Sequence, residues 1–403
     1  MAKKIVVVGG NIGGLTVALE LKRKMKDEVE VTLVNPTQTF TFTPSMIWVI
    51  YGRRKPSQAS FSMRPALEKA NVKFIMGKAT KIDPEAKKVH VDTGDILPYD
   101  FVVIATGPKL YWDAVPGLGP EGGFTHSVCT LPHTLSAYKA WQAFLKDPGP
   151  IVVGGVQGAS CLGAAYEVVL NLEYAARKAG VRDKVDVTFI TPEPFLSHFG
   201  IGGIGKGAIK MVEKFFQKRG IKWIINAEVE EITQEAIVMK DGRVLPQKYT
   251  VLIPPFKGVD FLLQSPDIAD ANGFIPTRDD YRHVKYEDIY AAGIAVAAAP
   301  PEETPVPMGV PKTGFPTETM ARVVVDNIIA DIKGEPHKEF PLAKMPAPCV
   351  LDAGRGEIII FVQHFLPPHG FSLVLPDPTG SLAKIIFEKY YQWKMRTGRA
   401  WLP

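Results

Sequence analysis

Short apolar runs alternate with longer amphipathic segments along most of the chain. The β-branched run at residues 5–8 ends in a glycine turn, and apolar side chains such as Leu15, Ala18 and Leu19 then follow at helical spacing. A second apolar run, at residues 29–35, comes about twenty residues after the turn. Strand, turn, helix and strand in this order predict a βαβ unit, and hence an α/β fold that holds an anion at the start of its first helix.

Two further apolar runs end in turns of small residues. Residues 100–104 lead into Ala105-Thr106-Gly107, and residues 288–291 lead to Gly293, which is followed by a turn and a helix over residues 311–332. Small residues let the backbone approach a ligand closely. With the first turn, Gly9-x-Asn11-x-x-Gly14, these turns occur in the order found in flavoproteins that have two dinucleotide-binding domains.

Another glycine-rich turn lies in the middle of the chain, where residues 152–161 read VVGGVQGASC. Residues 185–193 supply the strand that would follow it. Gly154 keeps the first glycine position of a dinucleotide motif, but Val156 and Ala159 occupy the other two. Because Val156 is branched where pyrophosphate needs close backbone approach, we expect the fold to persist without binding NADH or NADPH. The alternative is a drifted turn that still binds NAD.

Composition narrows the class of protein. The chain has 403 residues, 46% of them hydrophobic and 22% charged, which allows two ordinary domains. The net charge of +5 does not favour nucleic acid. MAKK leads straight into the first strand, so we expect no signal peptide, and no apolar run approaches the roughly 18 residues of a bilayer span. We expect no metal ion.

The chain has three cysteines, Cys129, Cys161 and Cys349. A small and odd number of cysteines argues against the disulfide framework of a secreted protein. Cys161 is expected on the first turn of a helix, where the helix dipole would stabilise its thiolate. His133 would share a helix face with Cys129 if that segment is helical, and His198 lies in a glycine-rich loop. None of the cysteines lies in an apolar run, which favours thiol chemistry over inert core positions.

Several stretches together resemble the sulfide:quinone oxidoreductase family over practically the whole chain. They are FTFTPSMIWV (40–49), IATGPKL, VCTLPHT, GPIVVGGVQGASCLGAAYE, ITPEPFLSHFGIGGIG, IPPFKGV, AAGIAVAAAPPEETPVPMGVPKTG and IIFEKYYQWKM. The resemblance implies FAD as cofactor, hydrogen sulfide as electron donor, a membrane quinone as acceptor, and polysulfide or zero-valent sulfur as product. It implies a redox disulfide between Cys161 and Cys349, with Cys129 assisting sulfide entry or sulfur transfer, and leaves open whether Cys129 is also linked to the flavin.

The resemblance also assigns site residues. His133 and His198 would handle protons, with Glu167 as a weaker candidate whose alternative is an exposed helix carboxylate. The residues assigned to FAD are Gly9, Asn11, Gly14, Asn35, Pro44, Ala79, Thr106, Gly107, Gly293 and Lys312. Asn35 stands where a ribose-binding acid is usual, and Lys312 is placed at the N1–O2 edge of the flavin, with a solvated loop lysine as the alternative.

The C-terminal stretch 381–403 has a basic, aromatic and amphipathic pattern. Leu382, Ile386 and Tyr390 fall on one helical line. The flanking basic residues are Lys384, Lys389, Lys394, Arg396 and Arg399. Such a helix can lie in a lipid interface, which predicts a membrane-associated protein; the alternative is a helix docked on its own core. The quinone contacts assigned to this region are Phe315, Phe387 and Tyr391. Because only one such helix is present, we expect attachment to be weak or to depend on a homo-oligomer.

The predicted organisation is thus an α/β fold with two Rossmann-like domains and a C-terminal amphipathic segment at the membrane interface. Residues 1–112 and 285–345 form a discontinuous FAD-binding domain, residues 113–284 an inserted second domain with a degenerate NAD site, and residues 346–403 the C-terminal redox-cysteine and quinone region. Two other functions stay open: the flavoprotein subunit of a flavocytochrome c sulfide dehydrogenase, and a flavin-bearing sulfur sensor without turnover. Val156 and the thiols disfavour a type II NADH dehydrogenase.

Overall fold

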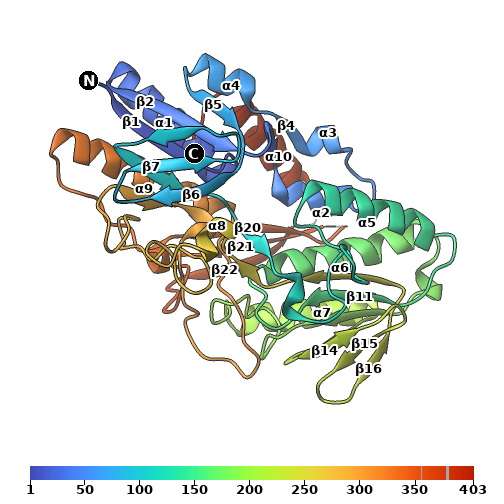
Figure 1. The fold of residues 1–403 in the computed structure, drawn as a ribbon. Helices are drawn as coiled ribbons and strands as arrows, with labels where there is room; N and C mark the ends of the chain where they lie inside the picture. The colour runs from blue at the N-terminus through green and yellow to red at the C-terminus, as the bar shows by residue number, and fades with distance from the viewer. Residues whose placement is uncertain (355, 378–380) are drawn as a thin grey trace.

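The computed structural model describes residues 1–354, 356–377 and 381–403. Two α/β units, each built on its own parallel sheet, make up most of the molecule, and a C-terminal antiparallel sheet lies between them (Figure 1). The predicted α/β class is confirmed.

The first unit is built on a five-stranded parallel sheet with the order β19-β9-β1-β2-β5. Its strands are apolar and nearly fully buried in the middle, as expected for a parallel sheet between helices. The parallel strands are β1 (Lys3–Val8), β2 (Val29–Asn35), β5 (Lys73–Met76), β9 (Phe101–Ile104) and β19 (Ile289–Ala291), and a separate antiparallel sheet holds β6 (Ala79–Asp83), β7 (Lys88–Val91) and β8 (Ile96–Pro98). The helices are α1 (Ile12–Met25), α4 (Arg64–Lys69), α8 (Asp260–Leu263) and α9 (Gly314–Lys333). Since β19 joins this sheet from far along the chain, the first unit is discontinuous in sequence.

The second unit repeats the plan with the parallel sheet order β13-β12-β11-β17. Its strands are β11 (Ile151–Gly155), β12 (Val187–Ile190), β13 (Ile221–Ile224) and β17 (Tyr249–Ile253), with β14 (Val229–Ile232), β15 (Ala236–Met239) and β16 (Val244–Pro246) in an antiparallel sheet. Its helices are α5 (Leu131–Phe144), α6 (Leu162–Lys178) and α7 (Lys206–Arg219). The chain passes between the units twice, and the two crossings pair as β10 (Lys109–Leu110) and β18 (Phe256–Lys257).

A long excursion of the first unit reaches across to the second. It contains β3 (Thr39–Thr41), α2 (Met46–Val49), α3 (Pro56–Ala59) and β4 (Ser60–Ser62). Helix α2 packs against α5 and α6, so residues 46–50 are buried in the core of the second unit.

The C-terminal region joins both units. It consists of β20 (Ala347–Asp352), β21 (Glu357–Val362), β22 (Ser372–Asp377) and α10 (Leu382–Arg396). Strand β20 packs on α6, whereas Tyr391 and Met395 of α10 are buried in the core of the first unit. Among the described residues, no helix combines the length and apolar character needed to cross a membrane.

Candidate active site

The first glycine turn is shaped to hold a pyrophosphate. Gly9 has φ +107°, and a Cβ there would collide with the Ala105 carbonyl, while a Cβ on Gly14 would collide with the Gly9 carbonyl. Helix α1 begins directly after Asn11, whose side chain makes no capping hydrogen bond. The first N–H groups of α1 therefore point out of a turn that only glycine can form, which fits a dinucleotide phosphate.

The other residues predicted to bind FAD gather at the same edge of the sheet. Ala105 N–H donates to the Val8 carbonyl (2.7 Å), which places Thr106 and Gly107 beside the glycine turn. The Asn35 side chain accepts a hydrogen bond from Gly10 N–H (2.8 Å), so this asparagine stabilises the turn itself. Gly293 is buried beyond β19, and Ala79 begins β6 just after the end of β5. Ligands of parallel sheets bind at the carboxyl ends of the strands, and this set fits that rule. Pro44 stays a prediction from the resemblance.

Lys312 is half-buried and bonded to the protein, and is not a solvated loop lysine. Its Nζ donates to the Val296 carbonyl at 2.5 Å and lies 4.4 Å from the ring centroid of Phe274. Burial lowers the pKa of Lys312 to about 8. It lines a cavity of about 70 Å³ whose walls come from both units, Ile294 from the first and Ser160 from the second. The cavity therefore lies between the dinucleotide edge of the first unit and the turn that precedes Cys161.

The second glycine turn is covered by another segment of the chain. Helix α6 begins only at Leu162, well beyond Val156, so the stretch between them is a non-helical loop. A strap at residues 306–311 packs on this loop: Gly158 N–H donates to the Pro307 carbonyl (2.7 Å), and Gly309 N–H donates to the Ala159 carbonyl (3.1 Å). Val156 itself is fully buried. The Gly158 N–H, a donor that could otherwise face a phosphate, is therefore bonded to the protein's own chain.

The two cysteines predicted to form the redox disulfide lie on two elements that are hydrogen-bonded to each other. Cys161 is the N-cap residue of α6, one position earlier than predicted, and Cys349 is in the middle of β20. Asp352 of β20 donates its N–H to Glu167 of α6 (2.6 Å) and accepts from the Asn171 side chain (2.7 Å). Cys349 is about 10 Å along the strand from this junction, and Cys161 about 9 Å along the helix.

The three thiols share one environment. Cys129 lies in the loop before α5, and all three are free thiols in this structure. Burial, together with a smaller contribution from Cys161, raises the pKa of Cys129 to about 12. Cys349 is accessible to solvent, yet the protein around it raises its pKa to about 12, with added contributions from Glu167 and Cys161. The structure therefore places Cys161 within electrostatic reach of both other cysteines.

The expected lowering of the Cys161 pKa is wrong. Burial raises the pKa of this thiol, and the nearby Ala164 N–H at the start of α6 lowers it only in part. Desolvation disfavours the charged form more than the helix terminus favours it. Cys161 is thus held as a neutral thiol when it is reduced.

Glu167 is a buried group and not an exposed helix carboxylate. Its Oε1 accepts hydrogen bonds from Asp352 N–H and from Nζ of Lys384 on α10. Burial raises the pKa of Glu167, and the Lys384 charge lowers it. The expectation that Lys384 and Lys394 flank the outer face of the C-terminal helix is wrong, because both are buried. Lys394 pairs with Glu318 of α9 at 2.6 Å.

The two histidines have different surroundings. Helix α5 begins at Leu131 with Thr130 as its cap, so Cys129 lies outside the helix and shares no helix face with His133, contrary to the expectation. His133 is half-buried, with Nε2 3.2 Å from Glu121. His198 is 1% exposed, with Nε2 2.8 Å from Glu302 and Nδ1 accepting Gly200 N–H. His198 is therefore not a surface histidine.

The aromatic residues assigned to quinone gather where α9 and α10 meet. Phe387 is exposed, whereas Tyr391 is buried behind it and donates its hydroxyl to Glu318 (2.7 Å). Phe42 contacts both rings, with centroids 5.7 and 5.4 Å away. Phe315, also exposed, is one turn before Glu318 on α9. The structure brings Phe387 and Tyr391 together and leaves Phe387 and Phe315 exposed.

Comparison with known proteins agrees with this geometry. The family model described as pyridine nucleotide-disulphide oxidoreductase matches residues 3–312. A sulfide-quinone reductase of Aquifex aeolicus is 38% identical over 99% of this chain and 92% of the relative. The chain belongs to the sulfide:quinone oxidoreductase family. The cofactor of this family is FAD, which the glycine turn of the first unit fits.

Other known proteins match this chain with different identities and coverages. The crystal structure of the sulfide:quinone oxidoreductase from Aquifex aeolicus superimposes with a TM-score of 0.93 at 37% identity and covers 98% of this chain and 92% of its own. The mitochondrial sulfide:quinone oxidoreductase of Dictyostelium discoideum is 27% identical over 83% of this chain and 72% of its own length. The NDH2 structure from Plasmodium falciparum, with a TM-score of 0.75 at 15% identity, covers 99% of this chain and 97% of its own and shares the fold alone.

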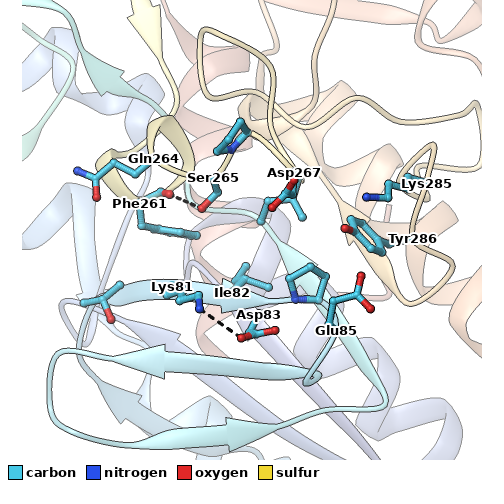
Figure 2. Close-up of a pocket in the computed structure, with 14 residues that line it drawn as sticks. Lys81, Ile82, Asp83, Glu85, Phe261, Gln264, Ser265, Asp267, Lys285 and Tyr286 are labelled. Carbon is cyan, nitrogen blue, oxygen red and sulfur yellow. Dashed lines mark hydrogen bonds and ion pairs between the residues drawn. The ribbon is translucent and has the colours of Figure 1, made fainter.

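The cavity drawn in Figure 2 is separate from the residues predicted for the redox chemistry. That cavity, about 450 Å³, opens between β6 and the loop after α8 and is lined by Phe261, Tyr286 and the Lys81–Asp83 ion pair (3.2 Å). None of the cysteines, histidines or FAD residues assigned from the sequence lines it.

Proposed function

We propose that the protein oxidises hydrogen sulfide and passes the electrons to a membrane quinone. One observation carries the proposal: Cys161 and Cys349 lie on α6 and β20, which are bonded to each other through Glu167 and Asp352, next to an FAD-binding edge. The blocked second turn supports it, since it leaves NADH without a phosphate site. The full-length similarity to a sulfide-quinone reductase supports the same substrate pair.

The residues of the first unit would hold the cofactor. The Gly9–Gly14 turn and the start of α1 suit its pyrophosphate, and Lys312 suits the electron-rich edge of its ring. When bound there, FAD would supply two-electron redox chemistry between the thiols and the quinone. The protein supplies the sulfur chemistry.

In the oxidised enzyme we place a disulfide between Cys161 and Cys349. Hydrosulfide attacks one sulfur, which leaves a persulfide on one cysteine and a thiolate on the other. Closing the bridge through the added sulfur would pass two electrons to bound FAD and the persulfide proton to a nearby base. A second hydrosulfide then attacks the middle sulfur, and reclosure of the Cys161–Cys349 disulfide expels HSS⁻ as polysulfide. Cys349 is the accessible sulfur, and Lys384 favours its anion.

Protons are handled on the second-unit side of this site. His198 is buried against Glu302, and His133 lies in the first turn of α5, close in sequence to Cys129. A neutral imidazole can take the proton that hydrosulfide formation or thiol ionisation releases. The raised pKa of all three cysteines makes such an acceptor necessary near neutral pH.

The quinone would enter through the exposed apolar surface of the C-terminal region. On α10 the apolar side chains Leu382, Ile386 and Trp393 point outward, and Ile386 is 59% exposed. The exposed apolar residues of the neighbouring sheet are Phe361, Phe371, Leu373 and Leu375. Apolar residues outward and ion pairs inward are the reverse of a water-facing helix, and suit a lipid surface. A homo-oligomer would enlarge this surface.

The test is anaerobic titration of the purified yellow protein with sulfide, followed by a soluble quinone. We expect the flavin absorbance to bleach with sulfide and to return with quinone. Bleaching without return on quinone addition would support the sensor. Return only with a c-type cytochrome as acceptor would support the flavocytochrome subunit.

A further inference from the structure

The backbone around His198 is held in a strained conformation. The residues on either side of it, Ser197 and Phe199, have φ values of +70° and +56°. Residues with a side chain rarely adopt this left-handed region, and a bulky residue such as Phe199 is strained there. Strain of this kind persists only where surrounding contacts enforce it.

Two buried side chains supply those contacts. Phe199 N–H donates to Oε1 of Glu193 (2.7 Å), and Ser197 N–H donates to the hydroxyl of Tyr166 (2.9 Å). The same Tyr166 hydroxyl donates to Oε2 of Glu193 (2.6 Å), as does Thr191 Oγ1 (2.7 Å). Both strained residues are thus bonded to one Tyr166–Glu193 pair.

The pair connects His198 to the helix of the redox cysteine. Tyr166 is on α6, whose N-cap residue is Cys161, and its neighbour Glu167 is hydrogen-bonded to β20. Its ring is buried, with the centroids of Phe189 and Phe199 4.5 and 5.2 Å away. Glu193, just beyond β12, stands where nucleotide-binding relatives of this fold place a ribose-binding acid. Here it is fully buried and turned towards the His198 loop.

We propose that Tyr166 and Glu193 are positioning residues, which hold His198 at a fixed place relative to Cys161. The inference rests on the proposed function, because it takes His198 as the proton acceptor of sulfide oxidation. Neither residue contacts substrate; each acts through the backbone on one side of the imidazole. Freed from them, the loop would relax to ordinary φ values and the ring would move.

The experiment compares Tyr166→Phe with a matched variant, Tyr249→Phe. Tyr249 is equally buried in the same unit and donates its hydroxyl to the Ala137 carbonyl (2.9 Å), away from the His198 loop. We expect the two variants to lose similar thermal stability, and only Tyr166→Phe to lose kcat for sulfide oxidation, by about tenfold. An equal kcat in the two variants would overturn the proposal.

A double-mutant cycle with His198→Ala decides whether the effect passes through the histidine. We expect Tyr166→Phe to cost less than about twofold in a His198→Ala background, because there is then no ring to position. A tenfold cost that persists in that background would overturn the positioning role while leaving the proposed function intact. If His198→Ala alone keeps full activity, the proton role of His198 fails and the inference fails with it.

Glu193 gives an independent version of the test. Glu193→Gln keeps an oxygen that can accept Phe199 N–H, whereas Glu193→Ala removes it. We expect the Gln variant to retain most of the kcat and the Ala variant to lose about tenfold. Equal activities for the two variants would contradict the positioning role, whatever their melting temperatures.

Discussion

At the scale of single residues, the site is a set of ionisable groups taken out of water. The thiols of Cys129 and Cys349 have pKa values raised to about 12, while Lys312 has a pKa lowered to about 8. Each shift favours the neutral form, as desolvation does. Sulfide chemistry at this site therefore begins from groups that gain charge only when a partner is close.

Each redox cysteine should be indispensable, and the two losses should not add. A disulfide needs both partners to open and reclose, so Cys161→Ser and Cys349→Ser should each lower sulfide-dependent quinone reduction by several orders of magnitude, and the double variant should lose no more. Cys129→Ser should slow turnover or sulfur release without abolishing it. Steady-state rates of the four variants check this, and a Cys161→Ser protein with near-parental rate would contradict the disulfide mechanism.

Glu193 should make the stability of the protein depend on pH. Burial raises its pKa to about 7. A carboxyl whose folded pKa is raised stabilises the folded state most below its unfolded pKa of about 4.3, and that contribution disappears as the pH rises through the folded value. Relative to Glu193→Gln, the parental free energy of unfolding should fall by about 2 kcal/mol between pH 5 and pH 8. Urea titrations of both proteins across this range measure it, and a difference independent of pH would refute it.

At the scale of elements, the sequence predicted the strands and turns better than the start of α6. The apolar runs correctly predicted β1, β9, β11 and β19, because each run is long enough to fill a buried strand. The glycine pattern suggested that α6 follows its turn directly, as α1 does. The helix instead starts at Leu162, because the 306–311 strap occupies the loop, and no local pattern announces a contact with a segment so distant in sequence.

This strap predicts that nicotinamide nucleotides are not substrates. NADH and NADPH should bleach the flavin far more slowly than sulfide does, since the Gly158 N–H is already bonded to the Pro307 carbonyl. Val156→Gly should leave that outcome unchanged, because it removes a side chain and not the strap. Stopped-flow absorbance with each reductant provides the measurement. Bleaching by NADH as fast as by sulfide would contradict the account of the second turn.

Helix α10 should bind lipid through its outer face and the protein through its inner face. Ile386→Glu and Trp393→Glu place charge on the exposed apolar side and should weaken binding to vesicles containing quinone while sparing the fold. Lys389→Glu, an exposed change on the same helix, should act mainly through charge and lose its effect at high salt. Vesicle sedimentation with and without salt measures both. Undiminished binding of the apolar-face variants would remove the interfacial role of α10.

At the scale of the whole molecule, the redox site depends on contacts between parts that are distant in the chain. The three cysteines come from the loop before α5, the start of α6 and strand β20, and the sequence grouped them only through family resemblance. The amphipathic pattern of residues 381–403 correctly gave an apolar line through Leu382 and Ile386. The same pattern wrongly assigned Lys384 and Lys394 to the outer face. Spacing alone cannot show that these lysines form ion pairs with Glu167 and Glu318 inside the protein.

The Lys384–Glu167 ion pair limits how the chain can be shortened to obtain a water-soluble protein. Cutting the chain before α10 would remove the cation that faces Glu167 and leave a buried carboxylate beside the thiols, so the trimmed protein should lose its sulfide chemistry as well as its lipid binding. On this account α10 supports the surroundings of the thiols and is more than a membrane anchor. A water-soluble version would need polar substitutions on the outer face of α10, at positions such as Leu382 and Ile386. The buried charged residues of the helix would have to stay unchanged.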